Sequence, residues 1–127
     1  PPKETQEEGV RFIDFVFDNR LMAILYSAAD LLLHTAPIDN LPNTVAESLR
    51  CGTPVAAFRT GGIPEMIEEK KTGWLVDEHN AEHMIALLAD TPRLKSSVND
   101  IQGFSDELFS EERAVTSYIS LFESIRR

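Results

Sequence analysis

The sequence predicts an α/β domain built on a doubly wound parallel sheet. Three observations predict it. Short apolar runs alternate with segments of helical spacing from residue 10 to about residue 88. Turns containing glycine or proline separate these segments. The chain has 127 residues, 43% of them hydrophobic, which is enough for one packed domain. Strands and helices that alternate in this way form a parallel sheet with right-handed crossovers.

The first expected elements follow a polar lead-in over residues 1–9. Residues 10–17 are rich in β-branched and aromatic side chains, which predicts a strand. Asp18 can then cap a helix, because its carboxylate accepts hydrogen bonds from the first free amides. The apolar positions of this helix are Leu21, Ile24, Leu25 and Ala28. Residues 31–33 are all leucine, and such a run suits a parallel strand that is covered on both faces.

Four further elements continue the alternation. We expect a helix over residues 43–50, a buried strand over 54–58, a short helix over 64–67 and a strand over 74–76. Gly52 ends the first of these helices, since glycine readily takes the left-handed conformation after a helix. Pro64 suits the first turn of the second helix. The strand at 74–76 predicts a core position for Trp74.

The C-terminal part is expected to be helical. Asn80 caps a helix across residues 84–88, a mixed stretch that we expect to be helical follows Pro92, and the last helix starts near Ser110. Acidic residues begin this last helix and basic residues end it, which opposes the helix macrodipole. Its apolar stripe is Val115, Tyr118, Ile119, Phe122 and Ile125. We therefore expect one domain over residues 10–127, with 110–127 as a C-terminal crossing helix.

Composition excludes several classes of function. The chain has 21 acidic and 12 basic residues, a formal net charge of -9, which argues against nucleic acid and against docking on an anionic membrane. No apolar run approaches the roughly 20 residues of a membrane span, and the polar N-terminus is no signal peptide. Cys51 is the single cysteine, so no internal disulfide forms, which fits a cytoplasmic protein.

Two loops are candidate ligand sites. Residues 38–44 and residues 60–64 each lie where a predicted strand ends and a helix starts, which is where open parallel sheets bind ligands. Free amides at a helix start attract anions, so a diphosphate is the obvious guest. Asp39 in the first loop and Glu47 one turn into the helix can face one ligand. Two structural alternatives stay open: Thr44 and Glu47 fit a capping box, and Asp39 fits a turn.

The run over residues 39–58, followed by Gly61-Gly62-Ile63-Pro64-Glu65, resembles the retaining glycosyltransferases of family 4. The similarity extends to residues 26–33 and 72–76 and covers roughly residues 10–88 plus the last helix. It implies the Rossmann-like C-terminal domain of the two-domain GT-B fold. It also implies a nucleotide-diphospho-sugar as substrate, without a metal or other cofactor. Amides at a helix start can offset phosphate charge without a cation.

The resemblance assigns roles to residues. Asp39 takes the place of the first of two family glutamates separated by seven residues, and is implied to act catalytically near the anomeric centre of the sugar. Glu47 takes the second place and is implied to bind the ribose hydroxyls. The implied donor-binding group is completed by Asn40, Leu41, Pro42, Asn43, Thr44, Val45, Gly61 and Gly62. The chain departs from many relatives at Thr35, Ala36 and Ile38, which surround the sugar position.

The resemblance also implies what these residues lack. The family stabilises the leaving diphosphate with an Arg and a Lys from an earlier part of the donor domain, and neither Arg50 nor Arg59 matches them. An N-terminal acceptor domain is the implied partner, and the longer enzyme is expected to be cytoplasmic or peripheral at the membrane. We expect the chain to be inactive alone. An open edge beside residues 31–33 predicts a rearranged or strand-exchanged homo-oligomer.

Several residues, and the function itself, have competing interpretations. The alternative function is a non-catalytic nucleotide-binding or interaction module. A response-regulator domain is disfavoured, because the sequence lacks the acidic cluster that such a domain needs at a strand end. His79 and His83 are four apart but have no evident third partner for a metal. His34 either points into the donor cleft or is a satisfied, partly buried histidine. Cys51 is interpreted as a small buried hydrophobe.

Overall fold

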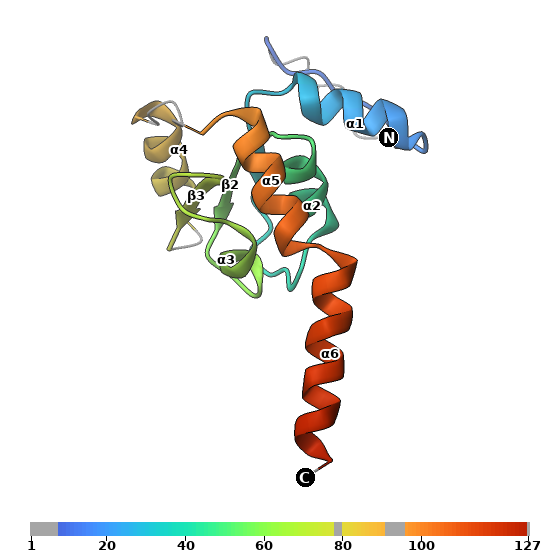
Figure 1. The fold of residues 1–127 in the computed structure, drawn as a ribbon. Coiled ribbons are helices and arrows are strands. Elements are labelled where there is room, and N and C mark those ends of the chain that lie inside the picture. The colour runs from blue at the N-terminus through green and yellow to red at the C-terminus, as the bar shows by residue number, and fades with distance from the viewer. Residues whose placement is uncertain (1–7, 78–79, 91–95, 127) are drawn as a thin grey trace.

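A parallel sheet of three strands forms the centre of the molecule. The computed structural model describes residues 8–77, 80–90 and 96–126 (Figure 1). The strands are β1 (Leu32–His34), β2 (Val55–Phe58) and β3 (Gly73–Val76), and their order in the sheet is β1-β2-β3. In the register, Leu32 faces Val55, and Val55 faces Gly73. The carboxyl ends of all three strands therefore meet at one edge of the sheet, where ligands bind in such folds.

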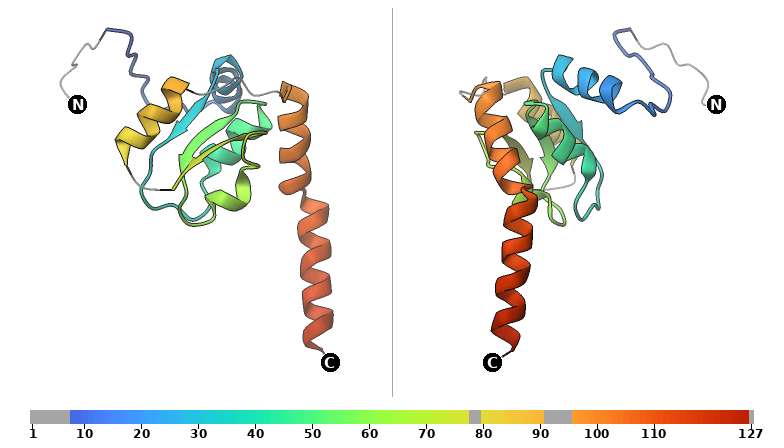
Figure 2. Two further views of the ribbon diagram at one scale, coloured as in Figure 1. Left: turned by 90° about the vertical axis from the view of Figure 1, so that its left-hand side faces the viewer. Right: turned by 45° about the vertical axis from the view of Figure 1, so that its right-hand side comes forward.

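Helices cover both faces of the sheet, as Figure 2 shows. On one face lie α2 (Asn43–Arg50), α3 (Ile63–Met66) and α5 (Val98–Leu108), and on the other lies α4 (Ala81–Asp90). The first face buries the main core, made of Val45, Leu49, Val55, Ala57, Ile63, Met66, Ile67, Leu75 and Ile101. The second core joins Ala56, Phe58 and Val76 to Met84. This three-layer arrangement confirms the doubly wound α/β class.

The central strands match their sequence patterns. Every residue of β2 and β3 is buried, Trp74 included, because helices lie on both sides of them. The prediction for β1 is wrong in one respect: Leu33 is 46% exposed, so this strand is not covered on both faces. A run of leucines does not show whether a strand lies at the centre or at the edge of a sheet, because strands in both places can consist of apolar residues.

The strand predicted over residues 10–17 is wrong. This segment has no regular structure, and its large side chains lie in solvent, with Phe12 75%, Ile13 64%, Phe15 79% and Phe17 88% exposed. Phe15 and Phe17 contact mainly each other, with ring centroids 4.6 Å apart. A β-rich composition favours a strand only when a neighbouring strand supplies hydrogen bonds, and β1 pairs only with β2 among the described residues.

Helix α1 (Asn19–Ala28) begins as predicted but buries a different face. The Asp18 carboxylate accepts a hydrogen bond from the Arg20 amide at 2.8 Å, which confirms the N-cap. Leu21 and Ile24, expected to face inward, are 46% and 62% exposed. Tyr26 is the buried residue instead, because α1 contacts the rest of the domain mainly through α2.

Helix α6 (Glu111–Ile125) extends away from the sheet and its helices (Figure 1). Ser110 caps it as predicted, with its hydroxyl accepting from the Arg113 amide at 3.2 Å. The apolar stripe forms but stays exposed along the helix. Its role as a crossing helix remains a prediction. Over the described ranges, no helix is both long and apolar enough to cross a membrane.

Two of the remaining predictions concern α4 and α5. The Asn80 side chain accepts from the Glu82 amide at 2.8 Å, which confirms the cap of α4. The helical stretch expected after Pro92 is α5, and Ser97 and Asp100 begin it with a capping box that the sequence analysis missed. Residues 1–7 of the predicted lead-in and residues 91–95 lie outside the described residues.

Candidate functional site

The two loops predicted to bind an anion pack against each other at the carboxyl edge of the sheet. The Gly62 amide donates a hydrogen bond to the Asn40 carbonyl oxygen at 2.7 Å. Gly61 has a positive φ of 51°, and a Cβ there would lie only 1.9 Å from the Asp39 carbonyl oxygen. A side chain at either glycine would push the loops apart. The glycine pair therefore sets the position of the Asp39 backbone.

The first turn of α2 presents free amides beside this loop. Pro42 is the N-cap residue and supplies no side-chain hydrogen bond. Its carbonyl accepts from the Val45 amide at 3.1 Å and the Ala46 amide at 3.4 Å. The amides of Asn43 and Thr44 have no acceptor within the described chain, and both residues are exposed. An uncapped, exposed helix start of this kind favours a bound anion.

Asp39 lies beside His34 at the end of β1. Its Oδ2 is 3.5 Å from His34 Nε2, and the two side chains are 33% and 13% exposed. His34 Nε2 is buried and has no hydrogen-bond partner. The two groups form an ion pair when His34 is protonated. His34 Nε2 therefore lies toward the loop that carries Asp39 and makes no hydrogen bond to a described residue, so the interpretation as a satisfied histidine is wrong. Its position in a donor cleft stays a prediction.

Glu47 is held by a tyrosine from another helix. The Tyr26 hydroxyl donates a hydrogen bond to Glu47 Oε2 at 3.2 Å. Burial, and then the negative charge of Glu47, raise the pKa of Tyr26 to about 12, so the phenol stays protonated and remains a donor at neutral pH. The capping-box alternative is wrong, because the helix starts at Asn43 and Thr44 lies inside it. The Glu47 side chain is thus free of any role at the helix start.

A hollow of about 300 Å³ lies next to Glu47, between α1 and α2. Its lining residues are Asn19, Met22, Ala23, Tyr26, Glu47, Arg50 and Cys51. Asp39 is not among them, so the two acids occupy different places around the start of α2. Cys51 is half-buried on this wall, whereas it was expected to be a small buried hydrophobe.

The remaining predicted donor residues differ in what they can offer. Leu41 is exposed, and Pro42 is buried. The Val45 side chain is fully buried in the main core, and its amide bonds to Pro42, so Val45 serves packing. The Gly62 amide is likewise engaged by Asn40, which leaves Gly61 as the exposed glycine of the second loop.

The arginines near the site are engaged by acids. Arg59 pairs with Asp77 and with Glu69, and these hydrogen bonds raise its pKa further. Arg50 lies 3.6 Å from Asp106 of α5, on the wall of the Glu47 hollow. Neither guanidinium is free to follow a developing phosphate charge without breaking an ion pair.

The structure also bears on metals. Within residues 8–77, 80–90 and 96–126, no group of three or more acidic, histidine or cysteine side chains is arranged to hold a metal ion. His79 lies outside the described residues, so the spacing of His79 and His83 is not tested.

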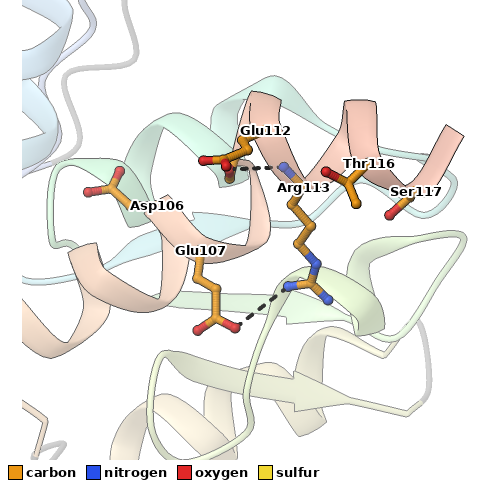
Figure 3. Close-up of a pocket in the computed structure, with 7 residues that line it drawn as sticks. Asp106, Glu107, Glu112, Arg113, Thr116 and Ser117 are labelled. Carbon is orange, nitrogen blue, oxygen red and sulfur yellow. Dashed lines mark hydrogen bonds and ion pairs between the residues drawn. The ribbon is translucent and has the colours of Figure 1, made fainter. Parts of the chain in front are cut away.

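A different hollow, of about 380 Å³, lies where α5 meets α6 (Figure 3). Asp106, Glu107 and Glu112 contribute carboxylates to it, and the Arg113 guanidinium lies 3.9 Å from Glu107. Negative charges outnumber the one paired cation, so this hollow disfavours a diphosphate. The candidate site is therefore the region around the start of α2.

Comparison with known proteins agrees with this fold. The glycosyl transferases group 1 family matches residues 2–90, so the chain belongs to that family. It corresponds to the C-terminal portion of the GT-B fold. A D-inositol 3-phosphate glycosyltransferase of Corynebacterium efficiens is 36% identical over 85 residues, which cover 67% of this chain and 19% of that protein.

Two solved structures share the fold. A sucrose-phosphate synthase from Thermosynechococcus elongatus superposes with a TM-score of 0.69 at 25% identity, covering 91% of this chain and 30% of that one. Anabaena HepE, solved in complex with UDP, superposes with a TM-score of 0.60 at 23% identity, covering 79% and 29%. The chain spans a third or less of the length of the curated relatives that it matches.

Proposed function

We propose that this chain binds the nucleotide-diphospho-sugar donor of a retaining glycosyl transfer. The diphosphate lies at the free amides of Asn43 and Thr44, and the ribose lies against the Glu47 carboxylate. One observation carries the proposal: an uncapped helix start is followed, one turn along the same helix, by an acid that lines a hollow. A carboxylate accepts hydrogen bonds from two vicinal hydroxyls, and helix-start amides offset phosphate charge without a metal.

Asp39 is proposed to serve the sugar end of the donor. It lies on the loop before α2, beside His34, and is not among the residues that line the Glu47 hollow. Its backbone is fixed by Gly61 and Gly62, and its carboxylate by the nearby His34. A negative charge held at this point stabilises positive charge that develops at the anomeric carbon.

We further propose that the 127 residues do not transfer sugar unaided. Arg50 and Arg59 are held in ion pairs, so neither is free to meet the leaving diphosphate. Stabilisation of that charge is a large part of the catalysis of such reactions. The cation is proposed to come from an earlier part of the donor domain, and the partner that binds the acceptor is an N-terminal GT-B domain.

Calorimetry with UDP and GDP tests the donor proposal. We expect one of the two to bind, and we expect Glu47→Ala to weaken it by roughly tenfold or more, because hydrogen bonds to a charged group contribute about 1.5–3 kcal/mol. Glu123→Ala on α6 is the matched control, since it removes an exposed glutamate far from the sheet. Equal affinity in both variants would reject the ribose assignment. The absence of binding would favour an interaction module.

Self-association is a second proposal about this chain. The exposed side chains of residues 10–17 offer apolar surface to a second copy, and β1 offers free backbone groups along the edge that pairs with no described strand. We expect light scattering to show a mass of at least twice the 14.2 kDa chain at micromolar concentration. A monomer under those conditions would count against it.

A further inference from the structure

Tyr26 lies beside the site but is not one of the donor-binding residues predicted from the sequence. It lies 21 residues before Glu47 in the chain, and it reaches the carboxylate only because α1 packs against α2. Its hydroxyl takes Glu47 Oε2 as acceptor. Within the described chain, Oε1 of Glu47 accepts no hydrogen bond, so it stays available to a ligand in the adjoining hollow.

The tyrosine is itself held in place at its backbone. Its carbonyl oxygen accepts from the Thr53 hydroxyl at 2.6 Å and from the Ala29 amide at 3.0 Å. Thr53 is buried, so water does not readily replace this contact. The ring is also buried, which restricts its rotation. A phenol fixed in this way can fix the flexible side chain of Glu47.

We propose that Tyr26 is a positioning residue that orients the Glu47 carboxylate toward the two vicinal hydroxyls of a ribose. The proposal rests on the proposed function and extends it from Glu47 to α1. Without the phenol, the glutamate would sample several rotamers and would form the paired contact less often. A ligand that lacks one of the hydroxyls cannot make the paired contact, so it should hardly respond to the loss of Tyr26.

The test is a comparison of UDP with 2′-deoxy-UDP, or of GDP with 2′-deoxy-GDP if guanine is the base. Calorimetry on the 127-residue chain gives the ratio of the two affinities for the wild type and for Tyr26→Phe. We expect the variant to bind the ribonucleotide roughly fivefold more weakly, because the paired contact forms less often without the phenol, and to bind the deoxynucleotide within about twofold of wild type. The ribose preference should therefore shrink.

Matched measurements separate positioning from general damage. Tyr118→Phe removes the other tyrosine hydroxyl, on the exposed α6, and should change neither affinity. Cys51 lines the same hollow, so its rate of alkylation by iodoacetamide without nucleotide should match in wild type and Tyr26→Phe. This control shows that the hollow itself is intact.

Each outcome of these measurements either supports or overturns the proposed role of Tyr26. A smaller ribose preference in Tyr26→Phe with unchanged Cys51 alkylation supports the proposal. An equal loss of affinity for both nucleotides, or no loss, overturns it while leaving the donor proposal standing. If the wild type binds ribo- and deoxynucleotide alike, or binds neither, the ribose assignment of Glu47 fails, and the role of Tyr26 fails with it.

Discussion

Replacing Gly61 by alanine should destabilise the domain by about 2 kcal/mol or more. The native φ of 51° lies in the left-handed region, which costs a residue with a Cβ roughly 1–2 kcal/mol. The new Cβ would also lie 1.9 Å from the Asp39 carbonyl oxygen, whereas such contacts are essentially never shorter than 3.0 Å. The two loops must therefore move apart by at least about 1.1 Å, the difference between these two distances. This movement weakens the hydrogen bond from the Gly62 amide to the Asn40 carbonyl oxygen.

Urea denaturation followed by tryptophan fluorescence measures this loss. Trp74 is the single tryptophan and is buried in β3, so its emission reports on the sheet. With an m value of about 2 kcal/mol per molar, the midpoint should fall by about 1 M. Gly103→Ala is the matched control: a Cβ there meets nothing within 4 Å inside α5, so it should stabilise by about 0.5–1 kcal/mol. A midpoint for Gly61→Ala at or above wild type would refute the reasoning.

Three further predictions follow from the same contacts. Asp18→Ala removes the N-cap of α1, so amides of that helix should exchange with solvent faster, by about 1 kcal/mol of local stability. Folding holds the Tyr26 pKa above its ordinary value of 10.0, so the stability conferred by its protonated phenol is complete below pH 10 and is lost as pH rises through about 12. Absorbance at alkaline pH should show that step, and Tyr26→Phe should remove it. Asp39→Asn should leave UDP affinity within about threefold of wild type, because Asp39 lies outside the Glu47 hollow; calorimetry showing a loss as large as that of Glu47→Ala would contradict the separation of the two roles.

The elements that the sequence predicts well are those with local causes. Asp18, Asn80 and Ser110 each cap the helix they were expected to cap, because a cap needs only residues two or three positions apart. The strand over residues 10–17 fails for the opposite reason. Its backbone requires a neighbouring strand, and no feature of the segment itself reveals whether one is there.

The same distinction between local and long-range causes applies to the candidate site. The position of Glu47 one turn into a helix follows from the spacing around Pro42 and Gly52, and the structure places it there. Two contacts could not be predicted, because each joins segments more than 20 residues apart: the Gly62 amide with Asn40, and the Tyr26 hydroxyl with Glu47. A helical spacing of four between Met22 and Tyr26 was the available signal for the second contact. The more hydrophobic Leu21 and Ile24 obscured it.

The contacts around Glu47 close into a ring, which explains why its carboxylate has a fixed place. The Ser48 hydroxyl donates to the Thr53 carbonyl at 3.0 Å, the Thr53 hydroxyl donates to the Tyr26 carbonyl at 2.6 Å, and the Tyr26 hydroxyl donates to Glu47 at 3.2 Å. Glu47 and Ser48 are neighbours in the chain, so the ring returns to its start through one peptide bond. Its first two hydrogen bonds are buried, where water competes least. The Glu47 end of the candidate site is therefore positioned by the packing of α1 on α2, whereas the Asp39 end depends on two glycines.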